Sequence, residues 1–130
     1  MTPEELRRKV AAELLGKAAR DLNSARLLAA EEAVNSMFFS QQAAEKSAKA
    51  FLTAHDVAFR KTHDLRELGI ACTTILPALA PHVEACEPLT PFAVEARYLR
   101  LPLDPEAGEA LEALAKATAL YDAVKSELGL

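Results

Sequence analysis

The chain has 130 residues, of which 51% are hydrophobic and 26% charged, and its formal net charge is −4. This composition is typical of a one-domain globular protein, and the negative net charge argues against an extended nucleic-acid-binding surface, which needs many Lys and Arg contacts to phosphates. No apolar run approaches the roughly 20 residues that span a bilayer, and the N-terminus MTPEELRRKV lacks the apolar segment of a secretory signal. We therefore expect one cytoplasmic domain over residues 1–130 with no membrane segment.

The first predicted helix covers residues 3–31. Thr2 takes the N-cap position, Pro3 the first helical position and Glu5 the third, which together form a capping box. Small and apolar residues then recur at alternating steps of four and three, as on one buried stripe of a helix: Ala11, Leu15, Ala18, Leu22, Ala25 and Ala29.

The second predicted helix covers residues 36–55, with Asn35 or Ser36 as its N-cap. At about 100° per residue, its alanines and phenylalanines form one broad apolar arc. Three polar residues share the opposite face, with Lys46 at its edge and Gln41 at the boundary with the apolar arc: Gln42, Glu45 and Lys49.

This polar face has two interpretations. One is a solvent-exposed face that carries a helical ion pair, since Glu45 precedes Lys49 by four residues. The other is a contact surface, for a helix of another subunit or for a ligand, since Phe38 and Leu52 lie on the same face. A solvated stripe does not usually carry two large apolar side chains, so we favour a contact surface.

Prolines break the third helical region. A connection over residues 57–64 leads into it, with Thr62 or Asp64 as the next N-cap. We expect a short helix near residues 64–76 and another near 79–99, kinked at the last two of the prolines. Each of these prolines removes a backbone donor: Pro77, Pro81, Pro88 and Pro91.

The last predicted helix starts at Asp104–Pro105–Glu106, an acidic N-cap followed by proline, and runs to the C-terminus. No segment shows the alternation of a strand. The sequence thus predicts an all-α fold, a four-helix up-and-down bundle with a broken, proline-kinked third helical region.

No metal or cofactor site is expected. Cys72 and Cys86 lie too far apart for a CxxC motif and are interpreted as reduced, buried thiols. No Glu precedes a His by three residues, as a di-iron helical bundle would require. The four glycines are scattered, so no phosphate-cradling loop is present.

Several segments resemble one known family. The run from Phe38 to Leu52, FFSQQAAEKSAKAFL, is similar to the second-helix signature of the HEPN family (higher eukaryotes and prokaryotes nucleotide-binding). Residues 19–28 resemble its first helix, residues 61–65 (KTHDL) its connection into helix three, and residues 95–98 (EARY) the Arg-Tyr element before helix four. The resemblance spans about residues 18–128 in the right order.

The resemblance implies a four-helix bundle that commonly dimerises. The family includes ribonuclease toxins and partners of small nucleotidyltransferases. In the ribonucleases, an Arg is followed by four to six residues and a His, and catalysis needs no metal. Here none of the three histidines, His55, His63 and His82, has an Arg at that distance upstream, and no His follows Arg97. The Arg-Tyr element is also followed by Leu99 where the family usually has Pro.

We therefore expect a non-catalytic protein, a homodimer as the resemblance implies, that binds a nucleotide or a small nucleotidyltransferase in a toxin–antitoxin-like pair. The candidate binding residues lie in or beside the matched motifs: Gln42, Glu45, Lys46, Lys49, His63, Asp64, Arg97 and Tyr98. Simpler roles compete for four of them. His63 or Asp64 can cap the third helix, Arg97 can pair with a carboxylate such as Glu45, and Tyr98 can be a core aromatic.

The alternative is an enzyme. It would be a metal-independent ribonuclease toxin acting as a dimer, with His63 assisted by Arg60 or Arg97 in a different spacing from the family motif. These side chains would then have to meet at one phosphate.

Overall fold

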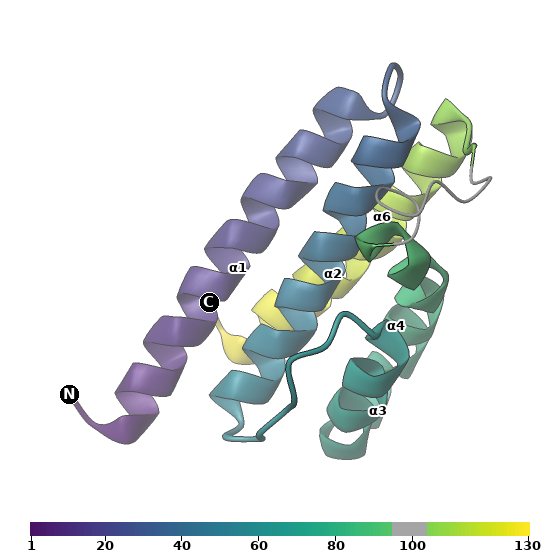
Figure 1. Ribbon diagram of the computed structural model, residues 1–130. Helices are drawn as coiled ribbons and strands as arrows, with labels where there is room; N and C mark the ends of the chain where they lie inside the picture. The colour runs from purple at the N-terminus through teal and green to yellow at the C-terminus, as the bar shows by residue number, and fades with distance from the viewer. Residues whose placement is uncertain (95–103) are drawn as a thin grey trace.

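The computed structural model describes residues 1–94 and 104–130, and these residues form helices and no strand. Three long helices, α1 (Pro3–Leu28), α2 (Ala33–Ala54) and α6 (Ala107–Leu128), are joined by shorter elements. α2 contacts α1, α6, α3, α4 and η2, so it is the central helix of the fold (Figure 1).

The N-terminal capping box is confirmed. Thr2 Oγ1 accepts a hydrogen bond from Glu5 N at 3.1 Å, and Glu5 Oε2 accepts one from Thr2 N at 2.9 Å. The six residues of the predicted stripe are all buried, and α1 ends at Leu28, three residues before the predicted end. At the other end of the chain, Gly129 adopts a φ of 66° and closes α6.

α2 begins at Ala33, and Glu32 occupies its N-cap without a side-chain bond, so the prediction of Asn35 or Ser36 as the cap was wrong. Ser36 instead donates its hydroxyl proton to Ala25 O of α1 at 2.7 Å. Small residues at the four–three spacing seen on α1 are buried along α2, which lets the two backbones approach closely: Ser36, Ser40, Ala43, Ser47 and Ala50.

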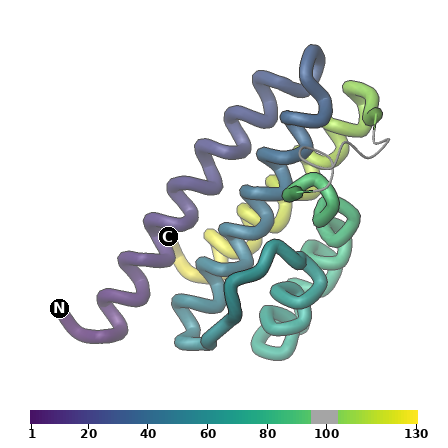
Figure 2. Tube along the Cα trace, in the orientation of Figure 1, coloured from purple at the N-terminus to yellow at the C-terminus, as the bar shows by residue number. Residues whose placement is uncertain are grey.

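α2 ends in a turn that folds the chain back along the helix (Figure 2). Val57 N donates to Leu52 O at 2.9 Å and Asp56 N to Thr53 O at 3.1 Å, which is a Schellman motif. Asp56 holds the left-handed position with a φ of 57°. The connection, residues 55–64, therefore returns beside α2 before α3 starts.

The proline-rich region is divided into four short elements: α3 (Leu65–Ile75), η1 (Pro77–Leu79), α4 (Ala80–Cys86) and η2 (Glu87–Ala93). Asp64 caps α3, as predicted, by accepting from Arg66 N at 2.9 Å. The prediction of a single kinked helix near residues 79–99 was wrong for the described residues up to 94. The α-helix stops before Pro88, and a 3₁₀-helix follows. The remaining residues of that expected helix lie outside the described part.

α6 starts at Ala107 with Glu106 at its N-cap, so the predicted cap at Asp104 was also wrong. The all-α class is confirmed, whereas the four-helix up-and-down arrangement and the single-domain organisation stay predictions. Within residues 1–94 and 104–130, no helix combines the length and the apolar character that a membrane crossing requires.

Candidate functional site

The carboxylate of Glu45, on α2, is the centre of a polar cluster. Its Oε1 atom accepts hydrogen bonds from Gln41 Nε2 at 3.1 Å and from His63 Nδ1 at 2.7 Å. Its Oε2 atom accepts one from Lys49 Nζ at 3.0 Å. We call these four residues, Gln41, Glu45, Lys49 and His63, the Glu45 cluster.

Gln41 fastens the connection to α2. Its side chain is fully buried, and Nε2 donates to the backbone oxygen of His63 at 3.3 Å in addition to Glu45. Its Oε1 atom accepts a hydrogen bond from Gln42 Nε2 at 2.7 Å. Sequence reasoning left Gln41 without a role, although its place one turn before Glu45 and at the edge of the apolar arc was the available signal.

Glu45 is only 5% exposed, yet its surroundings favour the ionised form. Burial alone would raise the pKa of this carboxyl, but hydrogen bonds from His63, Gln41 and Lys49, together with the charge of Lys49, outweigh it and lower the pKa. Because an ionised carboxylate only accepts, His63 Nδ1 carries the proton in this bond. The His63 side chain is 55% exposed, so its other nitrogen is left for the surface.

Two predicted site residues have other partners. Lys46 Nζ lies 2.5 Å from Asp21 Oδ2 of α1, a residue that was not among the predicted site residues. Asp64 is used as the cap of α3. The structure thus brings Gln42, Glu45, Lys49 and His63 together, with Gln41 added, while Arg97 and Tyr98 lie outside the described residues.

One family model matches the chain: the HEPN domain, over residues 11–127. The chain belongs to the HEPN family. No curated protein and no solved structure matches it. The HEPN assignment is consistent with nucleotide binding or a ribonuclease-like activity, and it matches the resemblance carried by the second-helix run.

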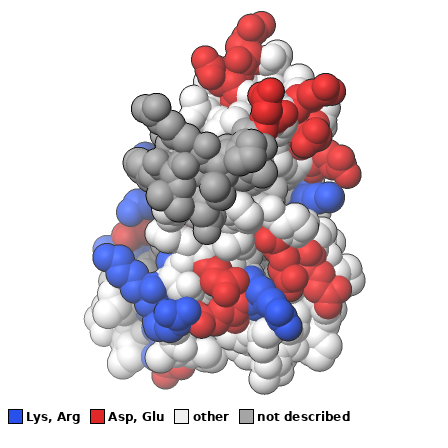
Figure 3. Space-filling view, turned by 45° about the vertical axis from the view of Figure 1, so that its right-hand side comes forward, with Lys and Arg blue, Asp and Glu red and all other residues white. Residues whose placement is uncertain are grey.

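On its exposed side, the connection also forms an ion pair with α3. Arg60 Nε lies 2.7 and 2.9 Å from the two carboxylate oxygens of Glu67 on α3. The side chains are 70% and 41% exposed, so this pair lies at the rim of the molecule. On the face in Figure 3, acidic side chains gather at one end, and basic and acidic side chains lie interspersed towards the other.

Neither cysteine belongs to the Glu45 cluster, and both are fully buried. Burial raises the pKa of the Cys72 and Cys86 thiols to about 12, with the charge of Lys116 lowering that of Cys86 slightly against it. Both thiols are therefore protonated at neutral pH and unreactive as nucleophiles. The described ranges contain no group of three or more His, Cys, Asp or Glu side chains placed to hold a metal ion.

Proposed function

We propose that this HEPN chain is a non-catalytic binding protein that associates with a small nucleotidyltransferase, in a toxin–antitoxin-like pair, and binds a nucleotide at the Glu45 cluster and the connection. Two facts support this proposal: membership of the HEPN family and the absence of the Arg-x4–6-His motif from the sequence. We also propose that the chain acts as a homodimer, which light scattering after size-exclusion chromatography would test.

The observation that carries the proposal is the buried anchoring of the connection by Gln41 and Glu45. A buried glutamine and a buried carboxylate hold both the backbone and the side chain of His63 in one position. Ordering this exposed segment before binding lowers the entropy that a partner must overcome. A surface held in this way favours recognition over a purely structural role for the polar residues.

The test is co-purification with a small nucleotidyltransferase encoded beside this chain, if the neighbouring genes include one. We expect a stable complex and a raised melting temperature in its presence, because a partner that binds only the folded state stabilises it. His63→Ala removes the exposed ring and should weaken the complex, whereas His82→Ala, on α4, is the matched control. Absence of a complex, together with no stabilisation by any nucleotide, would sink the proposal.

One observation favours a second candidate, the ribonuclease. A carboxylate that accepts from one imidazole nitrogen and leaves the other at the surface is an arrangement suited to general acid–base catalysis, and Glu45 and His63 have it. Arg60 is the candidate for the charge-stabilising cation, because its pair with Glu67 uses only the Nε atom among the described residues. RNA degradation in the presence of a chelator, lost in His63→Ala and kept in His82→Ala, would establish this candidate over the first.

A further inference from the structure

A cavity of about 270 Å³ opens between the connection and α3. Three residues of the connection and three of α3 line it: Ala58, Phe59, Arg60, Glu67, Leu68 and Ala71. Its size lies just below the roughly 300 Å³ at which small-molecule pockets begin, so it fits one ring system and not a larger ligand.

The walls of this cavity are mostly apolar and include one aromatic ring. Leu68 is 1% exposed and closes the cavity towards the core, while Phe59 is 37% exposed. Lys49 Nζ lies over the Phe59 ring, 5.8 Å from its centroid, so the ring is also in contact with the Glu45 cluster. An aromatic wall beside aliphatic side chains favours a planar ring, which stacks on one and packs on the other.

The rim of the cavity has unused hydrogen-bonding capacity. Arg60 uses its Nε atom on Glu67, and its two terminal amino groups have no partner among the described residues. Within residues 1–94 and 104–130, each Glu67 oxygen accepts only this one donor and can take a further N–H. Lys61 follows in the chain, is exposed, and forms no ion pair within the described ranges. The rim therefore offers Glu67 as an acceptor for a ring amino group and Arg60 as a cation for an anion, and Lys61, which does not line the cavity, is the next residue in the chain.

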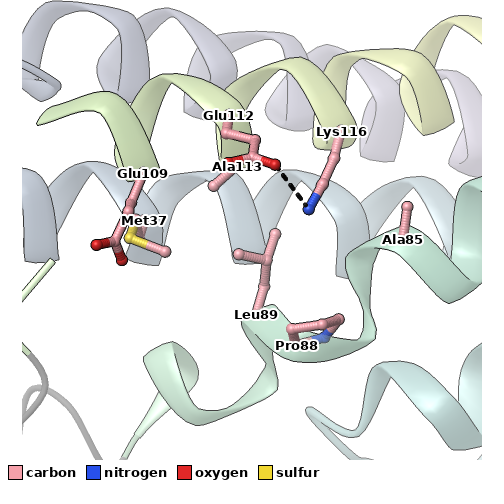
Figure 4. Close-up of a pocket in the computed structure, with 8 residues that line it drawn as sticks. All are labelled: Met37, Ala85, Pro88, Leu89, Glu109, Glu112, Ala113 and Lys116. Atoms are coloured by element: carbon pink, nitrogen blue, oxygen red, sulfur yellow. Dashed lines mark ion pairs between the residues drawn. The ribbon is translucent and has the colours of Figure 1, made fainter. Parts of the chain in front are cut away.

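Two other cavities fit such a ligand less well. A cavity of about 160 Å³ between α2, η2 and α6 has Glu109 and Glu112 at its edge, and its one cation, Lys116, pairs with Glu112 at 3.5 Å (Figure 4). This acidic edge repels an anion. The cavity beside Arg7 and Asp56 has no aromatic wall.

We propose that the Phe59 cavity binds the ring of a purine mononucleotide, with the phosphate on Arg60 and Lys61 and a ring amino group on Glu67. This inference rests on the proposed function and adds to it the ligand class and a subsite outside the Glu45 cluster. Lys49 links the two, since it contacts both Phe59 and Glu45.

Calorimetric titration of the full chain with AMP, CMP and ribose 5-phosphate tests the ligand class. AMP should bind more tightly than ribose 5-phosphate by about tenfold or more, because the latter lacks a stacking base, and CMP should fall between them. Equal affinity for AMP and ribose 5-phosphate would show that no base subsite exists and would overturn the proposal.

A matched pair of substitutions tests the place. Phe59→Ala should weaken AMP binding about tenfold, and Phe59→Tyr should keep it, because the ring remains. Ile70→Ala is the control. Ile70 is an apolar residue of α3 that is 57% exposed and does not line the cavity. Equal AMP affinities of Phe59→Ala and Ile70→Ala, with unchanged melting temperatures, would refute the cavity.

The failures of the two proposals are distinguishable. AMP binding that is lost in His63→Ala but kept in Phe59→Ala would overturn the proposal for the Phe59 cavity. It would leave the proposal of nucleotide binding at the Glu45 cluster standing. A complex with the nucleotidyltransferase, without affinity for any of the three probes, would overturn the proposal for the Phe59 cavity. The proposal that the chain binds a nucleotidyltransferase partner would stand.

Discussion

Two contacts hold the connection to the rest of the fold, and they differ in how deeply their side chains are buried. The Glu45 cluster fastens it to α2 through a carboxylate that is 5% exposed, whereas the Arg60–Glu67 pair fastens it to α3 through side chains that are 70% and 41% exposed. In the first contact, three side chains donate hydrogen bonds to the carboxylate: Gln41, Lys49 and His63. In the second, the two terminal amino groups of the guanidinium have no partner among the described residues. Burial thus predicts that the first contact contributes more to stability than the second, while each contact presents one exposed side chain for recognition, His63 in the first and Arg60 in the second.

Removing the carboxylate of each contact should give the largest difference between them in the free energy of unfolding. Glu45→Ala leaves Gln41 and Lys49 without their acceptor in a buried site, so we expect a loss of about 3 kcal/mol in the free energy of unfolding. Glu67→Ala removes an exposed partner and should cost less than about 1 kcal/mol. Urea denaturation followed by circular dichroism measures both, and similar losses would mean that burial does not separate the two contacts.

The two adjacent glutamines sharpen the same contrast. Gln41→Ala removes a fully buried amide with bonds to Glu45 and the His63 backbone, and we expect a cost of about 2 kcal/mol. Gln42→Ala removes one hydrogen bond from a half-buried side chain and should cost about 0.5 kcal/mol. Denaturation of the two variants provides the comparison, and a reversed order would contradict the assignment of Gln41 as the anchor.

Lowering the pH should remove the stability that the buried carboxylate of Glu45 contributes. The pKa of Glu45 is lowered from its ordinary value of 4.5, so the folded state favours the carboxylate. This stability is present in full above that value and is lost as the pH falls through 4.5 towards the folded-state pKa. Unfolding free energies of the wild type and Glu45→Gln should therefore converge as the pH falls below 4.5. A constant difference down to the acid limit would contradict the prediction.

Local signals in the sequence predicted much of the fold. The capping box at Thr2 and the cap at Asp64 depend only on neighbouring residues, and both were right. The position of α2 depends on the rest of the chain. A helical wheel gave it one apolar arc, but α1, α6, α3, η2 and the connection surround it, so Glu45 and Gln41 are buried as well.

Partners from distant segments were the part of the site that sequence could not supply. Asp21 pairs with Lys46 from α1, and His63 reaches Glu45 because the turn at Asp56 reverses the chain. Glycine is the usual residue at such a left-handed position, and aspartate gave no comparable signal. The Glu45–Lys49 pair could therefore be predicted from the spacing along one helix, but the bond between Glu45 and His63 could not.

The smallest expected effect concerns the Arg60–Glu67 pair itself. A double-mutant cycle with Arg60→Ala and Glu67→Ala should give a coupling of about 0.5 kcal/mol at low salt, because both side chains are exposed and water competes for them. In about 1 M NaCl, where the Debye length is near 3 Å, the coupling should largely disappear. A coupling above about 2 kcal/mol that persists in salt would mean that this pair holds the connection as firmly as Glu45 does. Arg60 would then be too tightly held to be free for a ligand, and the rim of the Phe59 cavity would lose its anion-binding group.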